Sequence, residues 1–318
     1  LKKYAKTLES DIESLTGFAE EKAHAKYADQ QKEAFQLLLN GGVGVLTGGP
    51  GTGKSTVVKG LLFAYQKLCP SAKIKLCAPT GRAAQRLKEV TGREATTIHK
   101  LLEYKPYGEV VSCKSEADPI DADLLIVDES SMISLDLADI LFSAIRSGTS
   151  VILVGDINQL PSVGAGNVLH DIIDSKAVPV VALTKTFRQA GESLIISNAK
   201  RILDGIPKLA TGPDFEVITA ETDESIPKLI MQQFQKYNDR NAVYTAQVLC
   251  PARRKRITGS QRLSVSLQSK LGLPQYPVLR YGGTAFLEGD KVMLIRNNYA
   301  DGYYNGDIGI VTAIKGSS

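Results

Sequence analysis

The sequence Gly48-Gly49-Pro50-Gly51-Thr52-Gly53-Lys54-Ser55 decides the fold class, because it satisfies the pattern G-x-x-x-x-G-K-[ST] at every fixed position. A short apolar run precedes it, at 43–47, and a helical stretch follows it, at 57–68. Glycines let the backbone wrap a phosphate and direct N–H groups at it, and the N-terminal end of the following helix adds positive charge. An ordinary glycine-rich turn is the alternative, which the strand and helix on either side disfavour. We therefore predict a phosphate-binding loop.

Each residue of this loop has an expected role toward a bound nucleotide. Lys54 should reach the β- and γ-phosphates of ATP, and Ser55 should bind Mg²⁺ through its hydroxyl group. The other residues expected to contact the nucleotide are Gly49, Pro50, Gly51, Thr52, Gly53 and Thr56. ATP and Mg²⁺ are therefore the expected cofactors.

Apolar runs and helical stretches alternate along the first part of the chain, which predicts β-α-β crossovers and a parallel sheet. The expected strands lie at 43–47, 74–78, 124–127, 151–155 and 178–183, and the expected helices at 57–68, 83–90, 135–146 and 168–173. A second region follows, with expected helices at 193–203 and 226–237 and short strands at 217–218 and 248–249. The β-rich runs at 291–295 and 308–314 flank the turn signals Asp301-Gly302 and Asn305-Gly306, which predicts a small all-β unit at the end.

Two adjacent acids follow the apolar run at 124–127. A parallel strand delivers the residues after it to the carboxyl edge of the sheet, where ligands bind. We expect Asp128 to hold Mg²⁺ through water and Glu129 to act as the general base that polarises an attacking water. A kinase has less need of such a Glu, because it transfers phosphate to a substrate. A strand that merely ends in a charged loop is the alternative.

Two further polar residues follow predicted strands. Gln159 comes just after the run at 151–155, where it can touch the γ-phosphate or the attacking water. Arg188 follows the run at 178–183, where it can stabilise charge on the transferred phosphoryl group, as an arginine finger within the chain. Taken singly, each residue is more readily explained as a solvated loop residue, because most Arg and Gln side chains in loops are solvated.

Composition bounds the class of protein. The chain has 318 residues, of which 43% are hydrophobic and 23% charged, as in ordinary globular domains. The net charge of +4 permits nucleic-acid binding without arguing for it. Neither a zinc site nor a disulfide framework is expected, because no two cysteines form a close C-x-x-C pair; they stand at Cys69, Cys77, Cys113 and Cys250. No membrane segment or signal peptide is expected, and cytoplasmic localisation follows.

Six motifs in one order resemble those of the RecD-like helicases of superfamily 1B. They are Gly48 to Thr56, Ala78-Pro79-Thr80-Gly81-Arg82-Ala83-Ala84, Thr97-Ile98-His99-Lys100-Leu101-Leu102, Ile126-Val127-Asp128-Glu129-Ser130-Ser131-Met132, Gly155-Asp156-Ile157-Asn158-Gln159-Leu160-Pro161 and Thr186-Phe187-Arg188-Gln189. The second and fourth are the most group-specific, and the resemblance extends from about residue 27 to about residue 313. It implies a RecA-like sheet, part of a second RecA-like domain and an SH3-like β unit.

The resemblance also implies roles for single residues. Gln31 falls where the family places a glutamine that reads adenine, although the usual Leu-Ser before it is Tyr27-Ala28 here. Thr80, Arg82 and His99 fall in segments that contact single-stranded DNA in the family. The alternatives are a solvated cation at a helix start for Arg82 and a satisfied, partly buried histidine for His99. The segment 104–110, with Tyr104 and Tyr107, lies where relatives carry a hairpin, or pin, that splits the duplex; an ordinary surface hairpin is the alternative.

The expected domain layout follows from the same motifs. It is a helical lead-in at 1–26, a first motor domain at 27–190 with the pin at about 102–113, part of a second motor domain at 191–283, and an SH3-like unit at 284–318. The family carries two more motifs after the SH3-like unit, and residues 314–318 supply neither, so we expect a C-terminally incomplete second motor domain. Leu1 in place of Met leads us to expect that the natural N-terminus lies upstream.

The sequence as a whole favours an enzyme that hydrolyses ATP to move along single-stranded DNA and unwind duplex DNA, 5′ to 3′ by resemblance alone. Single-stranded and forked DNA are the expected partners, and any partner proteins of a repair or recombination complex are left open. Two alternatives remain. One is a nucleic-acid-binding ATP switch that does not unwind. The other is a P-loop kinase, which Glu129, Gln159 and Arg188 disfavour.

Overall fold

The computed structural model describes residues 12–37, 42–107, 110–185, 193–236, 246–253, 257–270, 278–295, 303 and 306–315, without the side chains of residues 105–112 and 235. The chain divides into two compact units, Leu1–Phe215 and Glu216–Ser318. Among the helices of the described residues, none is long and apolar enough to cross a membrane.

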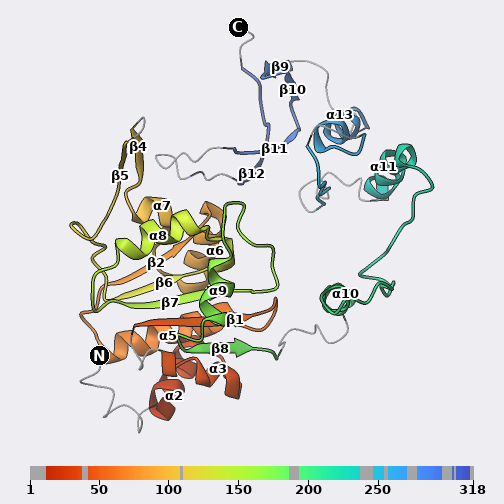
Figure 1. The fold of residues 1–318 in the computed structure, drawn as a ribbon. Coiled ribbons are helices and arrows are strands. Elements are labelled where there is room, and N and C mark those ends of the chain that lie inside the picture. Colours follow the sequence, from red (N-terminus) through yellow and green to blue (C-terminus); the bar gives the residue numbers. More distant parts are fainter. Residues whose placement is uncertain are drawn as a thin grey trace. The chain divides into compact units, whose positions relative to one another are not determined.

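The first unit is built on a six-stranded sheet with the order β3-β2-β6-β7-β1-β8, and every neighbouring pair in it is parallel (Figure 1). Its strands are β1 (Val43–Gly48), β2 (Ile74–Ala78), β3 (Ala95–Thr97), β6 (Leu124–Val127), β7 (Ser150–Gly155) and β8 (Val180–Leu183). The predicted parallel α/β sheet is therefore confirmed. The strand β3 was not predicted, because its three residues are too few to show a period.

Helices cover both faces of this sheet. In chain order the helices of the first unit are α2 (Ile12–Ala23), α3 (Asp29–Glu33), α5 (Lys54–Leu68), α6 (Gly81–Thr91), α7 (Ile98–Leu101), α8 (Leu135–Ser143), α9 (Val168–Asp174) and α10 (Leu194–Leu203). Helices α2, α5 and α6 contribute to the core on one face of the sheet, and α7, α8 and α9 contribute to the core on the other. Side chains alternate across a strand, so Leu46 packs with α5 on one face and Val45 with α7, α8 and α9 on the other. The strands are apolar on both faces for this reason, as parallel strands usually are.

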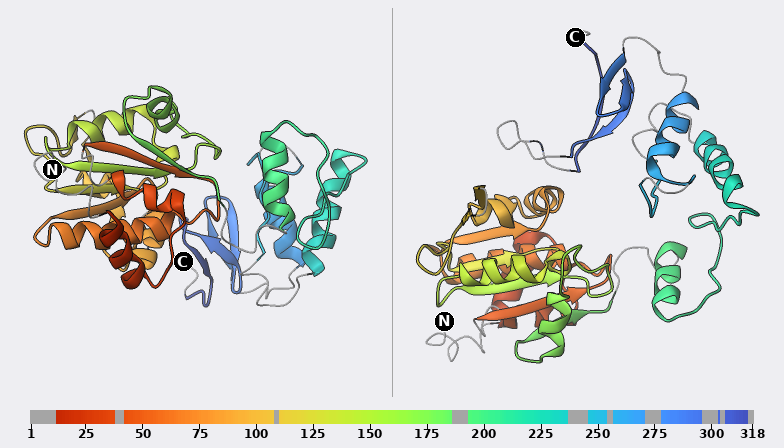
Figure 2. Two further views of the ribbon diagram at one scale, coloured as in Figure 1. Left: turned by 90° about the horizontal axis from the view of Figure 1, so that it is seen from below. Right: turned by 45° about the horizontal axis from the view of Figure 1, so that its top comes forward.

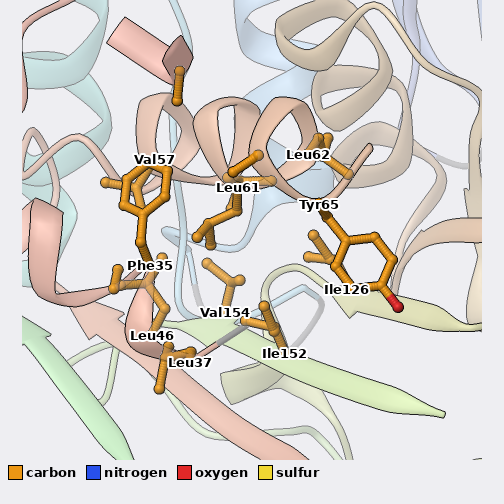
Figure 3. Packing of buried hydrophobic residues seen from close by; sticks show 14 of the residues in the cluster. Phe35, Leu37, Leu46, Val57, Leu61, Leu62, Tyr65, Ile126, Ile152 and Val154 are labelled. Atoms are coloured by element: carbon orange, nitrogen blue, oxygen red, sulfur yellow. The ribbon is translucent and has the colours of Figure 1, made fainter. Parts of the chain in front are cut away.

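The core on the α5 side is closely packed (Figure 3). Leu61 and Leu62 of α5 and Ile126 and Ile152 of the sheet are at most 1% exposed, and Figure 3 shows the α5 side chains directed at the strands. Each such side chain contributes about 1.5–3 kcal/mol through burial. This packing holds α5, and with it the loop at its N-terminus, against the sheet.

Helix α2 lies within the expected helical lead-in at 1–26 and packs along α5 (Figure 2). Residues 1–11 lie outside the described residues. The carboxylate of Glu20 accepts hydrogen bonds from the Tyr27 backbone N–H at 2.9 Å and from Lys26 Nζ at 2.7 Å. Tyr27 in turn lies over Gly60, where a Cβ would collide with its hydroxyl group, so α5 needs a glycine at that position. These contacts connect α2 and the segment before α3 to the middle of α5.

Several predicted boundaries are wrong, each for a local reason. Helix α8 stops at Ser143, because Ile145 turns away to form a parallel bridge with Ile120. Strand β8 begins at Val180, because Pro179 has no N–H to contribute to the ladder. The runs 217–218 and 248–249 are not strands, and their apolar side chains Val217 and Leu249 are exposed.

The second unit contains two helices and two small antiparallel sheets among its described residues. Its elements are α11 (Ile226–Lys236), α13 (Ser260–Lys270), β9 (Val278–Tyr281), β10 (Thr284–Leu287), β11 (Lys291–Met293) and β12 (Ile308–Ile310), with a 3-10 turn, η3 (Asp223–Ser225), before α11. Strand β9 pairs with β10 through the turn Gly282-Gly283, and β11 pairs with β12. The expected turn residues 301–302 and 305 lie outside the described residues.

One carboxylate joins these elements. Asp290 Oδ2 accepts hydrogen bonds from the Leu287 N–H at 2.7 Å and from Gln268 Nε2 of α13 at 2.5 Å. The backbone of Asp290 also accepts from the Val311 N–H at 2.9 Å. The predicted all-β unit is thus tied to a preceding helix through a residue that is only 9% exposed.

Candidate nucleotide and nucleic-acid site

The parallel order of the sheet brings distant loops together. All six strands point the same way, so the loops that follow β1, β2, β6, β7 and β8 leave from the same edge. The phosphate loop follows β1, Thr80 follows β2, Asp128 follows β6 and Gln159 lies after β7. The edge predicted from the sequence is therefore the edge that carries these residues.

The loop between β1 and α5 has a backbone that glycine makes possible. Gly51 and Gly53 have φ values of 78° and 84°, in the left-handed region. At Gly48 a Cβ would lie 2.7 Å from the Leu183 carbonyl of β8 and 2.8 Å from Thr52 Oγ1. The Thr52 hydroxyl closes the loop by donating to the Gly49 carbonyl at 2.8 Å. The result is a curved backbone at the N-terminus of a long helix, which suits an anion.

Lys54 is the first residue of α5, and its ammonium group lies over this loop. Its Nζ donates to the carbonyl of Gly48 and to that of Gly49, the latter at 3.1 Å. A cation held by two loop carbonyls is correctly placed to exchange them for phosphate oxygens. Ser55 and Thr56 follow on the first turn, both partly exposed.

Asp128 directly follows β6 and is largely buried. Its N–H donates to the Cys77 carbonyl of β2 at 2.9 Å, which extends the ladder by one residue. Burial raises the pKa of Asp128 from its ordinary 3.8 to about 6, a rise that the Glu129 N–H bond to its carboxylate and the charges of Lys54 and Arg86 partly oppose. A buried carboxylate near a lysine and lacking a full counter-charge fits a divalent cation.

The residues available for that cation are oxygen donors. Within the described part of the chain, no group of three or more His, Cys, Asp or Glu side chains gathers closely enough to hold a metal ion. Mg²⁺ needs no such cage, because it is usually held by one or two carboxylates together with phosphate oxygens and water. The Asp128 carboxylate and the Ser55 hydroxyl fit that pattern.

Glu129 has a left-handed backbone, with φ of 50° and ψ of 40°, which is uncommon for a residue other than glycine. Its N–H donates to Asp128 Oδ1 at 2.9 Å, and the 3-10 turn η1 (Ser130–Met132) starts directly after it. The Ser130 hydroxyl donates to the Val127 carbonyl at 2.7 Å and holds the turn. Gly155 of β7 packs beneath, where a Cβ would meet Ser131 N at 3.1 Å. The strained backbone therefore sets the direction of the Glu129 side chain.

Gln159 lies in an exposed turn after β7, and Arg188 lies outside the described residues. The turn is shaped by Asp156, which is 2% exposed and whose carboxylate accepts from the Asn158 N–H at 3.0 Å. The Gln159 N–H donates to the Asp156 carbonyl at 3.2 Å. This leaves the side chain of Gln159 exposed after the strand that neighbours both β1 and β6.

Two adjacent glutamines on α3 make different contacts. Gln31 is 4% exposed; its Oε1 accepts from the Ala28 N–H at 3.0 Å and its Nε2 donates to the Thr52 carbonyl at 3.1 Å. Each end of its amide thus makes one hydrogen bond within the chain, and at 4% exposure little of the amide is left accessible to a base. Gln30 instead accepts from the N–H of Thr184 at 3.0 Å, at the end of β8.

The residues expected to contact DNA lie near the start of α6 and α7. The Thr80 hydroxyl caps α6 by accepting from the Ala83 N–H at 3.2 Å, and Arg82 is exposed on the first turn. His99 is exposed on α7 and packs edge-on against Tyr104, with ring centroids 5.3 Å apart and planes at 86°. The side chain of Tyr107 lies outside the described residues.

The predicted hairpin is present. Strands β4 (Lys105–Tyr107) and β5 (Val110–Ser112) pair antiparallel with Lys105 opposite Ser112, and Figure 1 shows them extending beyond α7. Residues 108–109 at the tip lie outside the described residues. The antiparallel pair is therefore a separate two-stranded ribbon and not part of the main sheet.

Sequence reasoning did not identify two residues of this region, Arg86 and Gln30. Arg86 stands one helical turn after Arg82 on α6, a spacing that could have identified it, and its charge acts on Asp128. Gln30 had no such signal, because its partner Thr184 is 154 residues away in the chain.

Comparison with known proteins identifies two sequence families in the chain. The AAA domain family matches residues 31–165, and the ATP-dependent RecD-like DNA helicase SH3 domain matches residues 263–318. The chain is 36% identical to the ATP-dependent RecD2 DNA helicase of Deinococcus radiodurans, covering 93% of this chain and 40% of that protein. It is 33% identical to the RecBCD enzyme subunit RecD of Mycolicibacterium smegmatis, covering 90% of this chain and 57% of that protein.

Solved structures give a weaker similarity. The Pif1 helicase from Candida albicans is 19% identical with a TM-score of 0.48, over 90% of this chain and 69% of that chain. The Pif1 of a Bacteroides species in complex with ADP-AlF4 is 20% identical with a TM-score of 0.43, over 91% and 70%. The chain thus spans about half the length of the curated relatives it matches. On these sequence matches, the chain is similar to RecD-like helicases over about nine tenths of its length, and its residues 263–318 match the SH3 domain of that family.

Proposed function

We propose that the protein is an ATP-dependent DNA helicase, and that this chain carries its nucleotide site and part of its DNA path. The observation that carries the proposal is the juxtaposition at one sheet edge of a phosphate loop with Lys54 and a buried carboxylate, Asp128, followed by Glu129. Relatives whose names describe DNA helicases support the same conclusion.

The site residues have distinct roles in this proposal. The loop from Gly49 to Thr56 holds the phosphates of ATP, and Lys54 leaves the Gly48 and Gly49 carbonyls to pair with them. Ser55 and Asp128 hold Mg²⁺, which supplies charge neutralisation at the phosphates when bound. Glu129 accepts a proton from the attacking water, since it is the acid next to the magnesium-binding one. We assign Gln159 to the γ-phosphate or the water, and Arg188 to the charge that develops on the phosphoryl group.

Two variants test hydrolysis. Lys54→Ala should abolish ATP turnover and leave the fold intact, because the Lys54 ammonium group hydrogen-bonds to two loop carbonyls and the residue is not part of the buried core. Glu129→Gln should keep nucleotide binding while turnover falls by about 10²–10⁴-fold, since only proton transfer is removed. ATP turnover by Lys54→Ala at the wild-type rate would refute the phosphate-loop assignment. Loss of nucleotide binding in Glu129→Gln would instead make Glu129 a structural residue or a metal ligand.

The DNA path is proposed along the same domain. Thr80 and Arg82 at the start of α6, with His99 and Tyr104 at α7, contact single-stranded DNA, and the β4–β5 hairpin is the pin that separates the duplex. Arg82 is exposed, as a phosphate-binding cation must be, and the His99–Tyr104 pair offers aromatic faces on which bases stack. Movement in the 5′ to 3′ direction rests on the family alone.

The base-reading role of Gln31 is part of the proposal and has its own test. If the bonds to Ala28 and Thr52 open when nucleotide binds, Gln31→Ala should lose preference for ATP over GTP. If they persist, the variant should lose affinity for both nucleotides equally, because Gln31 then acts only through the phosphate loop. The ratio of the two KM values separates these cases.

The domain layout stays a proposal as well: a first motor domain at 27–190, part of a second at 191–283 and an SH3-like unit at 284–318.

A non-unwinding ATP switch differs from a helicase in one assay. A helicase displaces a strand from a forked duplex, whereas a switch hydrolyses ATP and binds DNA without displacing it. A kinase would transfer the γ-phosphate to a small acceptor, which is measured with labelled ATP. Partners among repair proteins are tested by co-purification.

A further inference from the structure

The base of the β4–β5 hairpin is held by a set of contacts that the proposed catalytic site does not need. The Lys114 N–H, which follows β5, donates to the Leu102 carbonyl before β4 at 2.8 Å. Tyr104 N–H donates to the His99 carbonyl at 2.9 Å, beside the edge-on contact of the two rings. The hairpin therefore leaves the domain through a short neck between α7 and residue 114.

Lys114 lies at the centre of this neck. Its Nζ lies 3.5 Å from a carboxylate oxygen of Glu103, in the turn between α7 and β4, and 2.9 Å from a carboxylate oxygen of Asp118, on the segment that follows β5. The Lys114 side chain is 21% exposed, whereas those of its two partners are 65% and 72% exposed. The Lys114 ammonium group therefore links the segment that enters the hairpin, through Glu103, to the segment that leaves it, through Asp118.

The backbone of the neck contains a residue in the left-handed region, directly before β4. Glu103 has φ of 53°, in the left-handed region, and its N–H donates to the Lys100 carbonyl at 3.1 Å. This conformation turns the chain sharply out of α7 into β4. The segment on the other side is closed by reciprocal backbone hydrogen bonds between Ser115 and Asp118, both 3.1 Å. Two tight turns thus face each other across Lys114.

We propose that Lys114 is a positioning residue that joins Glu103 to Asp118 and so holds the hairpin at a fixed angle to its domain. The inference rests on the proposed helicase function, in which the hairpin is the pin. A wedge separates base pairs only if the force of translocation does not simply bend it aside. The ion pairs themselves add little stability, because both acids are exposed and solvent screens their charges. Their effect is therefore on the orientation of the hairpin and not on folding of the domain.

The test uses the full-length protein and the variant Lys114→Met, which keeps the length of the side chain and removes its charge. We expect the base pairs opened per ATP hydrolysed to fall about two- to fivefold, as expected for the loss of weak exposed pairs. The kcat and KM of DNA-stimulated ATP hydrolysis should stay at wild-type values. Lys114→Arg should restore unwinding, because guanidinium can bridge both acids. The double variant Glu103→Gln/Asp118→Asn should reproduce Lys114→Met.

A matched control is Lys73→Met. Lys73 is also a partly exposed lysine paired with an acid, Asp121, but it lies directly before β2 and not at the neck of the hairpin. Its loss should leave unwinding per ATP unchanged. Amide hydrogen exchange supplies a readout independent of helicase activity: Lys114→Met should speed exchange across β4 and β5 and leave β6 unchanged.

The outcomes separate this proposal from the proposed function. Replacement of residues 105–112 by Gly-Ser-Gly should abolish unwinding if the hairpin is the pin. If that variant loses unwinding while Lys114→Met neither loses unwinding nor speeds exchange, Lys114 does not position the hairpin. If Lys114→Met speeds exchange but the hairpin replacement unwinds normally, Lys114 does fix the hairpin and the pin assignment fails. Loss of unwinding in Lys114→Arg equal to that in Lys114→Met would overturn the bridging role.

Discussion

Asp128→Asn should make the nucleotide-free protein more stable near neutral pH, although it removes a proposed ligand of Mg²⁺. The pKa of Asp128 is raised to about 6 in the folded chain, above its ordinary 3.8, mainly by burial. The folded state therefore binds the proton more tightly than the unfolded state does. The contribution of Asp128 to stability is present in full below pH 3.8 and is lost as the pH rises through about 6.

The magnitude follows from the difference between the two pKa values. A difference of about two units corresponds to about 3 kcal/mol, which the ionised carboxylate costs the fold at about pH 8. The neutral amide of the Asp128→Asn variant would avoid this cost, and its oxygen can still accept the bond from the Glu129 N–H. At about pH 5 the gain should shrink to about half, because the folded wild type is then mostly protonated while the unfolded chain is mostly ionised.

The assay is urea unfolding followed by circular dichroism at the two pH values, with amide exchange in β6 to localise the effect. The control is Glu116→Gln, which removes an exposed carboxylate elsewhere and should show no such gain. Mg²⁺ with ATP should stabilise the wild type and have a smaller effect on Asp128→Asn, since ligand binding stabilises only the competent fold. The reasoning would be refuted if Asp128→Asn were less stable than the wild type at about pH 8, or if its gain in unfolding free energy did not depend on pH. Either result would show that burial does not disfavour the ionised Asp128 carboxylate.

Three further predictions concern single residues. Glu129→Gly should be about 1 kcal/mol more stable than Glu129→Ala, because glycine adopts the left-handed backbone at no cost; both should lack turnover, and equal urea midpoints would contradict the strain. Gln31→Ala should lose about 1–3 kcal/mol without nucleotide, measured by urea unfolding, since the Thr52 carbonyl and the Ala28 N–H lose their partner. Asp290→Ala should destabilise the second unit by a similar amount, because two donors lose their acceptor. Asp290→Asn should recover part of that loss, and wild-type exchange rates in β10 and β11 of the Ala variant would argue against the role of this carboxylate.

The sequence by itself determined the elements that local chemistry encodes. The loop from Gly48 to Ser55 is recognisable because only glycines allow its positive φ angles and close approach to β8. The strands were predictable because strands buried on both faces are apolar throughout, and the acids after 124–127 were identifiable by their place at a strand end. Two elements are shorter than predicted. Strand β8 begins after Pro179, which has no N–H to donate, and helix α8 ends before Ile145, which pairs with Ile120 instead.

Other predictions failed because apolar composition does not specify a partner. The runs 217–218 and 248–249 have strand-like residues, yet a strand forms only where another strand accepts its backbone hydrogen bonds. The hairpin of β9 and β10 was not predicted, although its turn, Gly282-Gly283, is a glycine pair typical of tight hairpins. The role of Arg188 stays a prediction, because it lies outside the described residues.

Only the tertiary structure decided how these pieces meet. The order β3-β2-β6-β7-β1-β8 places β1 beside β7 and β8, and no periodicity in the chain specifies that order, because strand pairing depends on contacts between residues far apart in sequence. The raised pKa of Asp128 comes from burial between neighbouring strands, and the bond of Gln30 to Thr184 spans 154 residues. Lys114 shows the same limit at short range: its neighbours in sequence identify a lysine after a hairpin, but only the folded neck brings Glu103 and Asp118 to the same ammonium group.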